Sequence, residues 1–134
     1  MLTFFPPSFT ILRIPPSVNF FQVHPVFPAP VDFPINFPST MEAMRLVENG
    51  VATPEDIDKG VRLAFGRKMG PLETSDLVGL DVQLMAYNNV YDEEKDPRFY
   101  PPSILRRKVL AGQLGRKTGK GWYEYNSDGS RKTD

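Results

Sequence analysis

From Met41 onward, apolar residues recur at the three- and four-residue spacing of amphipathic helices. The stretch 66–81, GRKMGPLETSDLVGLD, organises this part of the chain. We expect Gly66 to end one helix and residues 67–70 to form a basic turn. Pro71 is expected to open the next helix, because its fixed φ and missing N–H suit the first helical position.

The same pattern predicts about five short helices. Thr53 and Pro54 form a helix start signal, followed by acidic residues in the first turn. Gly79 and Asp81 are expected to end one helix and begin the next. The predicted helices are 41–49, 54–65, 71–78, 81–92 and 103–111. No segment from 41 to 121 shows the period-two alternation of a strand, so we predict an all-α fold.

Residues 1–40 do not share this pattern. They hold 9 of the 14 prolines and 8 of the 10 phenylalanines, with Arg13 and Asp32 as their only charged residues. Proline recurs too often there for a long helix. We therefore predict an irregular Pro/Phe-rich extension over 1–40, a helical domain over 41–125 and a frayed polar tail over 126–134. The extension is interpreted as poorly ordered or as a non-native translated segment.

Composition narrows the function classes. The chain has 16 basic and 16 acidic residues, which gives no electrostatic case for nucleic acid or an anionic membrane as a partner. There is no cysteine, and His24 is the only histidine, so thiol chemistry and a His-rich metal site within the chain are excluded. No apolar run approaches the roughly 18 residues that a membrane helix needs.

Three segments carry a resemblance to a known family: EAMRLVENGVATPEDIDKGVRLAFG, MGPLETSDLVGLD and DPRFYPPSILRRKVLAGQLGRKTGKGWYEY. In this order and spacing, they make 41–125 resemble the C-terminal helical domain of NAD-dependent 3-hydroxyacyl-CoA dehydrogenases, including the 3-hydroxybutyryl-CoA type. The resemblance implies an enzyme that interconverts 3-hydroxyacyl-CoA and 3-oxoacyl-CoA in fatty acid or butanoate metabolism. In that family a Rossmann domain binds NAD and carries a His–Glu pair, while the helical domain completes the acyl-CoA cleft and forms the dimer.

The cofactor and catalytic parts of that family are missing from this pattern. No G-x-G-x-x-G follows a strand, and no βαβ pattern occurs. Phe33 stands where the family has its active-site asparagine. His24 lies in a segment partly similar to the family's catalytic histidine motif, but a chance histidine is the better interpretation. We therefore assign no catalytic, NAD-binding or metal residues, and we expect the chain alone to be inactive as a dehydrogenase.

The resemblance does suggest residues of the acyl-CoA cleft. The candidates are Arg67, Lys68, Met69, Gly70, Pro71, Arg116 and Lys117. The alternative for the first five is a helix–helix connector with solvated charges. The alternative for the glycine-rich stretch 115–121 is a turn that docks the end of the chain. Asp56 and Asp81 are interpreted as helix-start residues, and Asp76 as a solvated helix residue.

Several roles remain open from the sequence. The chain could be an oxidoreductase component that works with a separate Rossmann-domain polypeptide, a non-catalytic dimerisation or acyl-CoA-binding module, or a truncated gene product. We expect a homodimer in the cytoplasm, with the mitochondrial matrix as the alternative location. The predicted dimer face consists of Ile57, Val61, Phe65, Leu84, Tyr87 and Tyr91. The alternative is that these residues form only the internal core.

Overall fold

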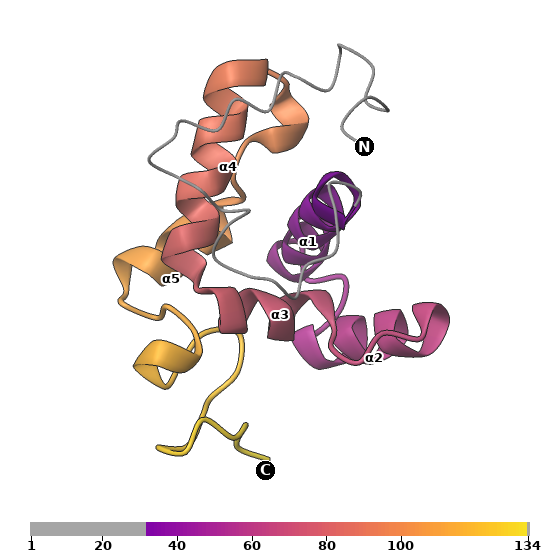
Figure 1. Ribbon diagram of the computed structural model, residues 1–134, viewed down its shortest axis with the longest axis vertical. Coiled ribbons are helices and arrows are strands. Elements are labelled where there is room, and N and C mark those ends of the chain that lie inside the picture. The colour runs from indigo at the N-terminus through magenta and orange to yellow at the C-terminus, as the bar shows by residue number, and fades with distance from the viewer. Residues whose placement is uncertain (1–31, 134) are drawn as a thin grey trace, which may run out of the picture.

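The computed structural model describes residues 32–133, so the predictions for 1–31, His24 among them, lie outside the described residues. Within this part of the chain the all-α prediction is confirmed, because the strand-like pairs are isolated bridges only (Figure 1). The elements are α1 (Asp32–Glu48), α2 (Pro54–Phe65), α3 (Pro71–Val78), α4 (Leu80–Glu94), η2 (Pro97–Phe99), α5 (Ser103–Leu110) and η3 (Arg116–Thr118). Among the described residues, no helix is long and apolar enough to cross a membrane.

The first helix differs from its predicted range. α1 begins at Asp32 rather than Met41, so it enters the region predicted to be irregular and contains Pro38. A proline inside a helix removes one N–H donor and crowds the carbonyl four residues earlier. Tertiary packing offsets that cost, because Phe37 meets the ring of Tyr87 edge-on with 4.2 Å between the ring centroids.

The predicted start and end signals of α2 are confirmed. Thr53 is the N-cap, and its hydroxyl accepts a hydrogen bond from the backbone N–H of Asp56 (3.2 Å). Pro54 takes the first helical position, and the helix ends at Gly66 in the left-handed conformation. The two ends of this helix are therefore fixed by local sequence signals.

α3 and α4 meet at a sharp turn. Pro71 occupies the first position of α3, as predicted, and the chain leaves the helix at Gly79 with a φ of 104°. The backbone N–H of Leu80 then donates to the carbonyl of Leu114 at 3.0 Å. This bond ties the start of α4 to the C-terminal segment, residues 112–133, and α4 runs steeply away from α3 (Figure 1).

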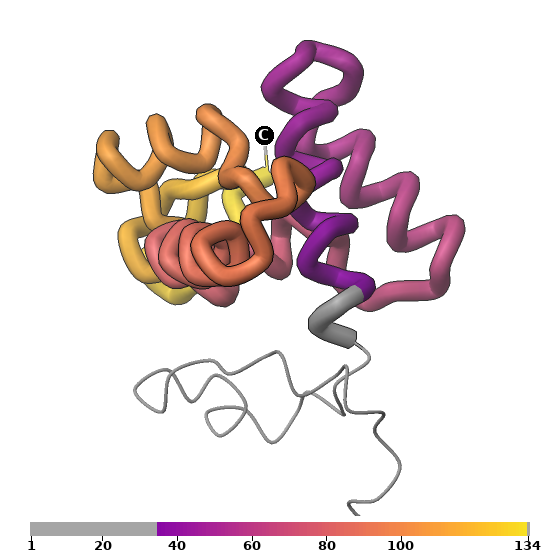
Figure 2. Tube along the Cα trace, turned by 90° about the horizontal axis from the view of Figure 1, so that it is seen from above, coloured from indigo at the N-terminus to yellow at the C-terminus, as the bar shows by residue number. Residues whose placement is uncertain are grey.

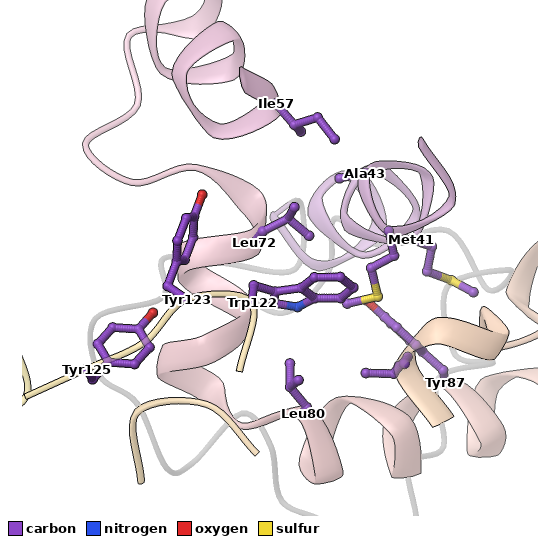
Figure 3. Close-up of a cluster of buried hydrophobic side chains, with 11 residues drawn as sticks. Met41, Ala43, Ile57, Leu72, Leu80, Tyr87, Trp122, Tyr123 and Tyr125 are labelled. Atoms are coloured by element: carbon purple, nitrogen blue, oxygen red, sulfur yellow. The ribbon is translucent and has the colours of Figure 1, made fainter. Parts of the chain in front are cut away.

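One hydrophobic core joins the helices α1 to α5 to the C-terminal segment. Its fully buried apolar side chains are Met41, Met44, Leu72, Leu80, Tyr87 and Leu105. Trp122 of the C-terminal segment adds its indole ring in the middle of this group (Figure 3). Seen from above, α4 and α5 lie on one side and α1 and α2 on the other, with the end of the C-terminal segment between them (Figure 2). The C-terminal segment is therefore an integral part of the domain.

The predicted dimer face is largely internal. Tyr87 and Ile57 are buried, and Leu84 packs against the core, so for these residues the alternative of an internal core is correct. Phe65 differs, since 72% of it is exposed. The reason is geometric: α2 packs on α3 and α1, while its C-terminal end projects from the rest of the domain (Figure 1).

The described part of the polar tail, residues 126–133, folds back on the domain. The backbone N–H of Lys132 donates to the carbonyl of Glu124 at 2.8 Å. The guanidinium of Arg131 lies 2.9 Å from the carboxylate of Glu55 on α2. The described residues 126–133 therefore contact both the preceding part of the C-terminal segment and α2.

Candidate functional site

The predicted cleft turn, residues 67–71, connects α2 to α3. Lys68 is exposed, and Arg67 is half-buried with its guanidinium 6.0 Å from the centroid of the Phe65 ring. Neither cation has a carboxylate partner among residues 35–133. The turn therefore carries two unneutralised positive charges, an arrangement that favours an anionic ligand.

A buried carboxylate from α2 holds the start of α3 beside this turn. Asp58 is 1% exposed, and its two oxygens accept hydrogen bonds from the backbone N–H groups of Leu72 and Glu73, both at 2.9 Å. These are two of the N–H groups that a helix start leaves unpaired, and a negative charge is favourable there. Gly70 permits this approach, because a Cβ at that position would lie 2.3 Å from the Asp58 side chain. This helix start is therefore closed to an external anion.

The C-terminal segment reaches the same carboxylate. The hydroxyl of Tyr123 donates to Oδ2 of Asp58 at 2.7 Å. Burial, the hydrogen bond to Asp58 and its negative charge raise the pKa of the Tyr123 phenol, so this group is a proton donor at neutral pH. Asp58 thereby joins α2, α3 and the C-terminal segment at one point.

A second buried carboxylate anchors the C-terminal segment to α3. Asp76 is 1% exposed and accepts hydrogen bonds from the N–H of Trp122 (2.8 Å), the N–H of Tyr123 (3.0 Å) and the hydroxyl of Tyr125 (2.8 Å). The prediction that Asp76 is a solvated residue is wrong. Burial raises the pKa of Asp76, and the three hydrogen bonds offset part of that effect.

The sequence contained a signal for Asp76 but none as clear for Asp58. Asp76 follows Leu72 by four residues, which places both on the inner face of α3. Leu77 was predicted to supply apolar contacts but is 54% exposed. Hydrophobicity alone ranks a leucine above an aspartate for the core. The order is reversed here because donors from the distant C-terminal segment satisfy the carboxylate.

The remaining cleft candidates, Arg116 and Lys117, lie on η3 and are paired with acids. The guanidinium of Arg116 lies 3.7 Å from the carboxylate of Glu73, and the ammonium of Lys117 lies 2.6 Å from that of Asp81. Burial pulls the pKa of Asp81 upward, but its hydrogen bond to Lys117 and the lysine charge outweigh this effect and hold the pKa below its usual range. Arg116 thus lies beside the start of α3, whereas Lys117 contacts α4.

The glycine-rich stretch 115–121 is filled by protein rather than open. A Cβ at Gly115 would lie 2.3 Å from the backbone oxygen of Asp76, and one at Gly121 would lie 2.1 Å from its Oδ1. No strands flank this stretch within residues 32–133, so the described chain does not fit a dinucleotide cofactor. Nor does that part of the chain contain a group of three or more His, Cys, Asp or Glu residues that could hold a metal ion.

Comparison with known proteins gives the family. The model of the 3-hydroxyacyl-CoA dehydrogenase C-terminal domain matches residues 34–125. This chain belongs to the 3-hydroxyacyl-CoA dehydrogenase family. The 3-hydroxybutyryl-CoA dehydrogenase of Mycobacterium tuberculosis is 48% identical over 88 residues, which make up 66% of this chain and 31% of that relative. The mitochondrial hydroxyacyl-coenzyme A dehydrogenase of Homo sapiens is 39% identical over 89 residues, or 66% of this chain and 28% of the relative.

Solved structures agree with the sequence relatives. Against the crystal structure of M. tuberculosis FadB2, the TM-score is 0.68 at 45% identity, covering 69% of this chain and 33% of that one. Against (S)-3-hydroxybutyryl-CoA dehydrogenase PaaH1 from Ralstonia eutropha, the TM-score is 0.69 at 40% identity, covering 71% and 34%. The chain thus has the fold of a dehydrogenase C-terminal domain and spans about a third of the length of the curated relatives it matches.

Proposed function

We propose that this chain supplies the acyl-CoA cleft and dimerisation domain of an enzyme that interconverts 3-hydroxyacyl-CoA and 3-oxoacyl-CoA with NAD. The match of residues 34–125 to the family's C-terminal domain carries this proposal. In this proposal the NAD-binding part is a Rossmann domain outside residues 32–133, because these residues do not fit the cofactor. No hydride-transfer step is assigned to this chain. Its proposed location is the cytoplasm, with the mitochondrial matrix as the alternative, since one relative is named as mitochondrial.

Within this function, the cleft turn binds the anionic end of an acyl-CoA. Arg67 and Lys68 supply the charge, because no carboxylate of the described residues neutralises them. Met69, Gly70 and Pro71 form the wall of the cleft in this proposal. Arg116 and Lys117, although candidates by the same resemblance, contribute less, because Glu73 and Asp81 already pair with them.

A binding experiment and an activity assay test this function. We expect calorimetry to detect binding of acetoacetyl-CoA to the full chain, and binding to weaken when Arg67→Gln and Lys68→Gln are combined. Lys59→Gln is the control, because Lys59 is an exposed cation outside the turn. We expect NADH oxidation with acetoacetyl-CoA only after the N-terminal two thirds of a related enzyme is added. If the chain alone oxidises NADH, the proposal that the cofactor domain lies outside these residues is wrong. If the chain neither binds acetoacetyl-CoA nor supports NADH oxidation by the added N-terminal part, the acyl-CoA role is wrong.

A role in dimerisation, with or without catalysis, is favoured by one observation. The projecting end of α2 exposes Phe65 (72%), one of the residues of the predicted dimer face, whereas Leu63 (77%) lies on another side of the helix. Exposed apolar patches often mark interfaces, and a second copy would bury the same patch twice around a two-fold axis. We expect sedimentation to show a dimer that Phe65→Ser weakens. Leu110→Ser is the control, since Leu110 is 87% exposed on a different helix. A chain that stays monomeric as concentration rises contradicts this role.

A further inference from the structure

We propose that Asp58 and Tyr123 are positioning residues of the cleft turn, so that the C-terminal segment controls how strongly residues 67–71 bind an acyl-CoA. This inference rests on the proposed binding at that turn. It adds a second support for the turn: Tyr123, which lies 65 residues along the chain from its partner Asp58 on α2. Neither residue contacts the ligand in this proposal, since both side chains are buried.

The first step of the argument is the direct contact between Asp58 and the turn. Gly70 packs so closely on the Asp58 side chain that a Cβ would lie 2.3 Å from it. The same carboxylate accepts the N–H groups of Leu72 and Glu73, which immediately follow the turn. Movement of this carboxylate therefore displaces the C-terminal end of the turn and the first residues of α3 together.

The second step is the contact that fixes the carboxylate itself. Oδ2 of Asp58 accepts both the Glu73 N–H and the Tyr123 hydroxyl, so rotation of the carboxylate costs both bonds. Tyr123 is in turn held on both sides: its N–H donates to Asp76, and the Arg131 guanidinium stacks on its ring at 3.9 Å. Figure 3 shows the Tyr123 hydroxyl directed toward the connection between α2 and α3. The C-terminal segment thus supplies a rigid donor to the support of the turn.

Tyr125 provides a matched control. Its hydroxyl also donates to a buried aspartate, Asp76, at 2.8 Å, compared with 2.7 Å for the bond from Tyr123 to Asp58. Asp76 lies in the second half of α3, and its hydrogen bonds within the described residues go to the C-terminal segment rather than to the turn or to the first N–H groups of that helix. The substitutions Tyr123→Phe and Tyr125→Phe therefore remove bonds of similar length, of which only the first ends on the carboxylate that contacts the turn directly.

The experiment compares these two variants of the full chain. We expect Tyr123→Phe to speed hydrogen exchange at the Leu72 and Glu73 amides more than Tyr125→Phe does. We also expect it to raise the Kd for acetoacetyl-CoA by about fivefold or more, the lower end of typical coupling between sites. Tyr125→Phe should raise that Kd less, because Tyr125 reaches the turn only indirectly, through Asp76 and the backbone of Tyr123. If both variants only lower overall stability and bind equally well, the positioning role is wrong.

Two further outcomes keep this inference separate from the proposed function. If the wild-type chain does not bind acetoacetyl-CoA, the binding function fails, and the exchange rates of the two amides still decide whether Tyr123 supports the turn. Asp58→Asn perturbs the same contact from the α2 side and should act in the same direction if Tyr123→Phe fails to fold. Unchanged amide exchange in both variants overturns the proposal.

Discussion

Asp76→Asn tests the most consequential contact in the fold, because it removes one charge while keeping the side chain's shape. The carboxylate accepts three hydrogen bonds from the C-terminal segment and is 1% exposed. An amide oxygen in place of Oδ2 still accepts from Tyr123 and Tyr125. The amide nitrogen then faces the N–H of Trp122, which leaves two donors opposed.

The magnitude follows from these three bonds. Leaving one buried N–H without an acceptor costs about 1–3 kcal/mol, and replacing a charged acceptor by a neutral one weakens each remaining bond by about 1 kcal/mol. The asparagine also avoids the cost of burying a charge, which offsets part of this loss. Because the raised pKa of Asp76 shows that the cost of burying the charge outweighs the charge-assisted gain, the opposed donors dominate, and we expect a net loss of about 1–3 kcal/mol out of the about 5–15 kcal/mol that stabilises a typical domain.

Trp122 makes the measurement direct, because it is the only tryptophan and lies next to this carboxylate. Urea unfolding followed by its fluorescence reports the docking of the C-terminal segment, and circular dichroism reports the helices. With an m value of about 1.5 kcal/mol/M, a loss of about 1–3 kcal/mol lowers the unfolding midpoint by about 0.7–2 M. Coincident transitions from the two signals would show that the C-terminal segment unfolds with the domain.

Asp81→Asn is the control for this prediction. Asp81 is also an aspartate with a basic partner, Lys117, but its side chain is 39% exposed. An exposed pair of this kind contributes about 0–1 kcal/mol. If Asp76→Asn lowers the unfolding midpoint no more than Asp81→Asn does, the buried hydrogen bonds of Asp76 contribute no more to stability than an exposed ion pair. Should Asp76→Asn not fold, Tyr125→Phe removes a single bond to the same carboxylate and gives a smaller loss.

Three further predictions concern pH, packing and chain length. Burial raises the pKa of Asp76 above its unfolded value near 3.8, so its stabilising contribution is complete below that pH and is lost as pH rises through the folded pKa. The stability gap between wild type and Asp76→Asn should therefore widen as pH falls from about 7 to about 4 in urea titrations. Gly121→Ala should cost about 1–3 kcal/mol by overpacking, whereas Gly60→Ala, with no atom within 4 Å, should stabilise α2 by about 0.5–1 kcal/mol. Deleting residues 1–31 should preserve the helical circular dichroism and the unfolding midpoint, whereas deleting 1–40 should lower that midpoint because the aromatic pair between α1 and α4 is lost.

Local sequence rules predicted the helix ends where the deciding contacts lie within a few residues. Thr53 caps α2 through a hydroxyl and an N–H three residues apart. Pro71 opens α3, since a proline at that position loses no hydrogen bond. Gly66 ends α2 in a conformation that other residues adopt at a cost. In each case the physical cause was visible in the printed sequence.

The start of α1 and the role of Asp76 could not be predicted in the same way. Local rules penalise Pro38 inside a helix, and the compensating contact between Phe37 and Tyr87 joins residues 50 positions apart. Asp76 is unfavourable in a core until its donors arrive from residues 46 to 49 positions away. Both errors have one cause: tertiary contacts reversed a local preference.

The two buried carboxylates also explain how an irregular C-terminal segment can complete the core. A buried segment outside helices and strands leaves backbone N–H groups without regular partners. Asp76 accepts hydrogen bonds from two such groups, the N–H of Trp122 and the N–H of Tyr123. Asp58 accepts a hydrogen bond from the hydroxyl of Tyr123. Each carboxylate in turn needs donors from distant parts of the chain to offset the cost of its burial. Since neither side is satisfied alone, the C-terminal segment and α3 depend on each other for their hydrogen bonds, which is why we expect a substitution at Tyr123 to affect the turn at Gly70.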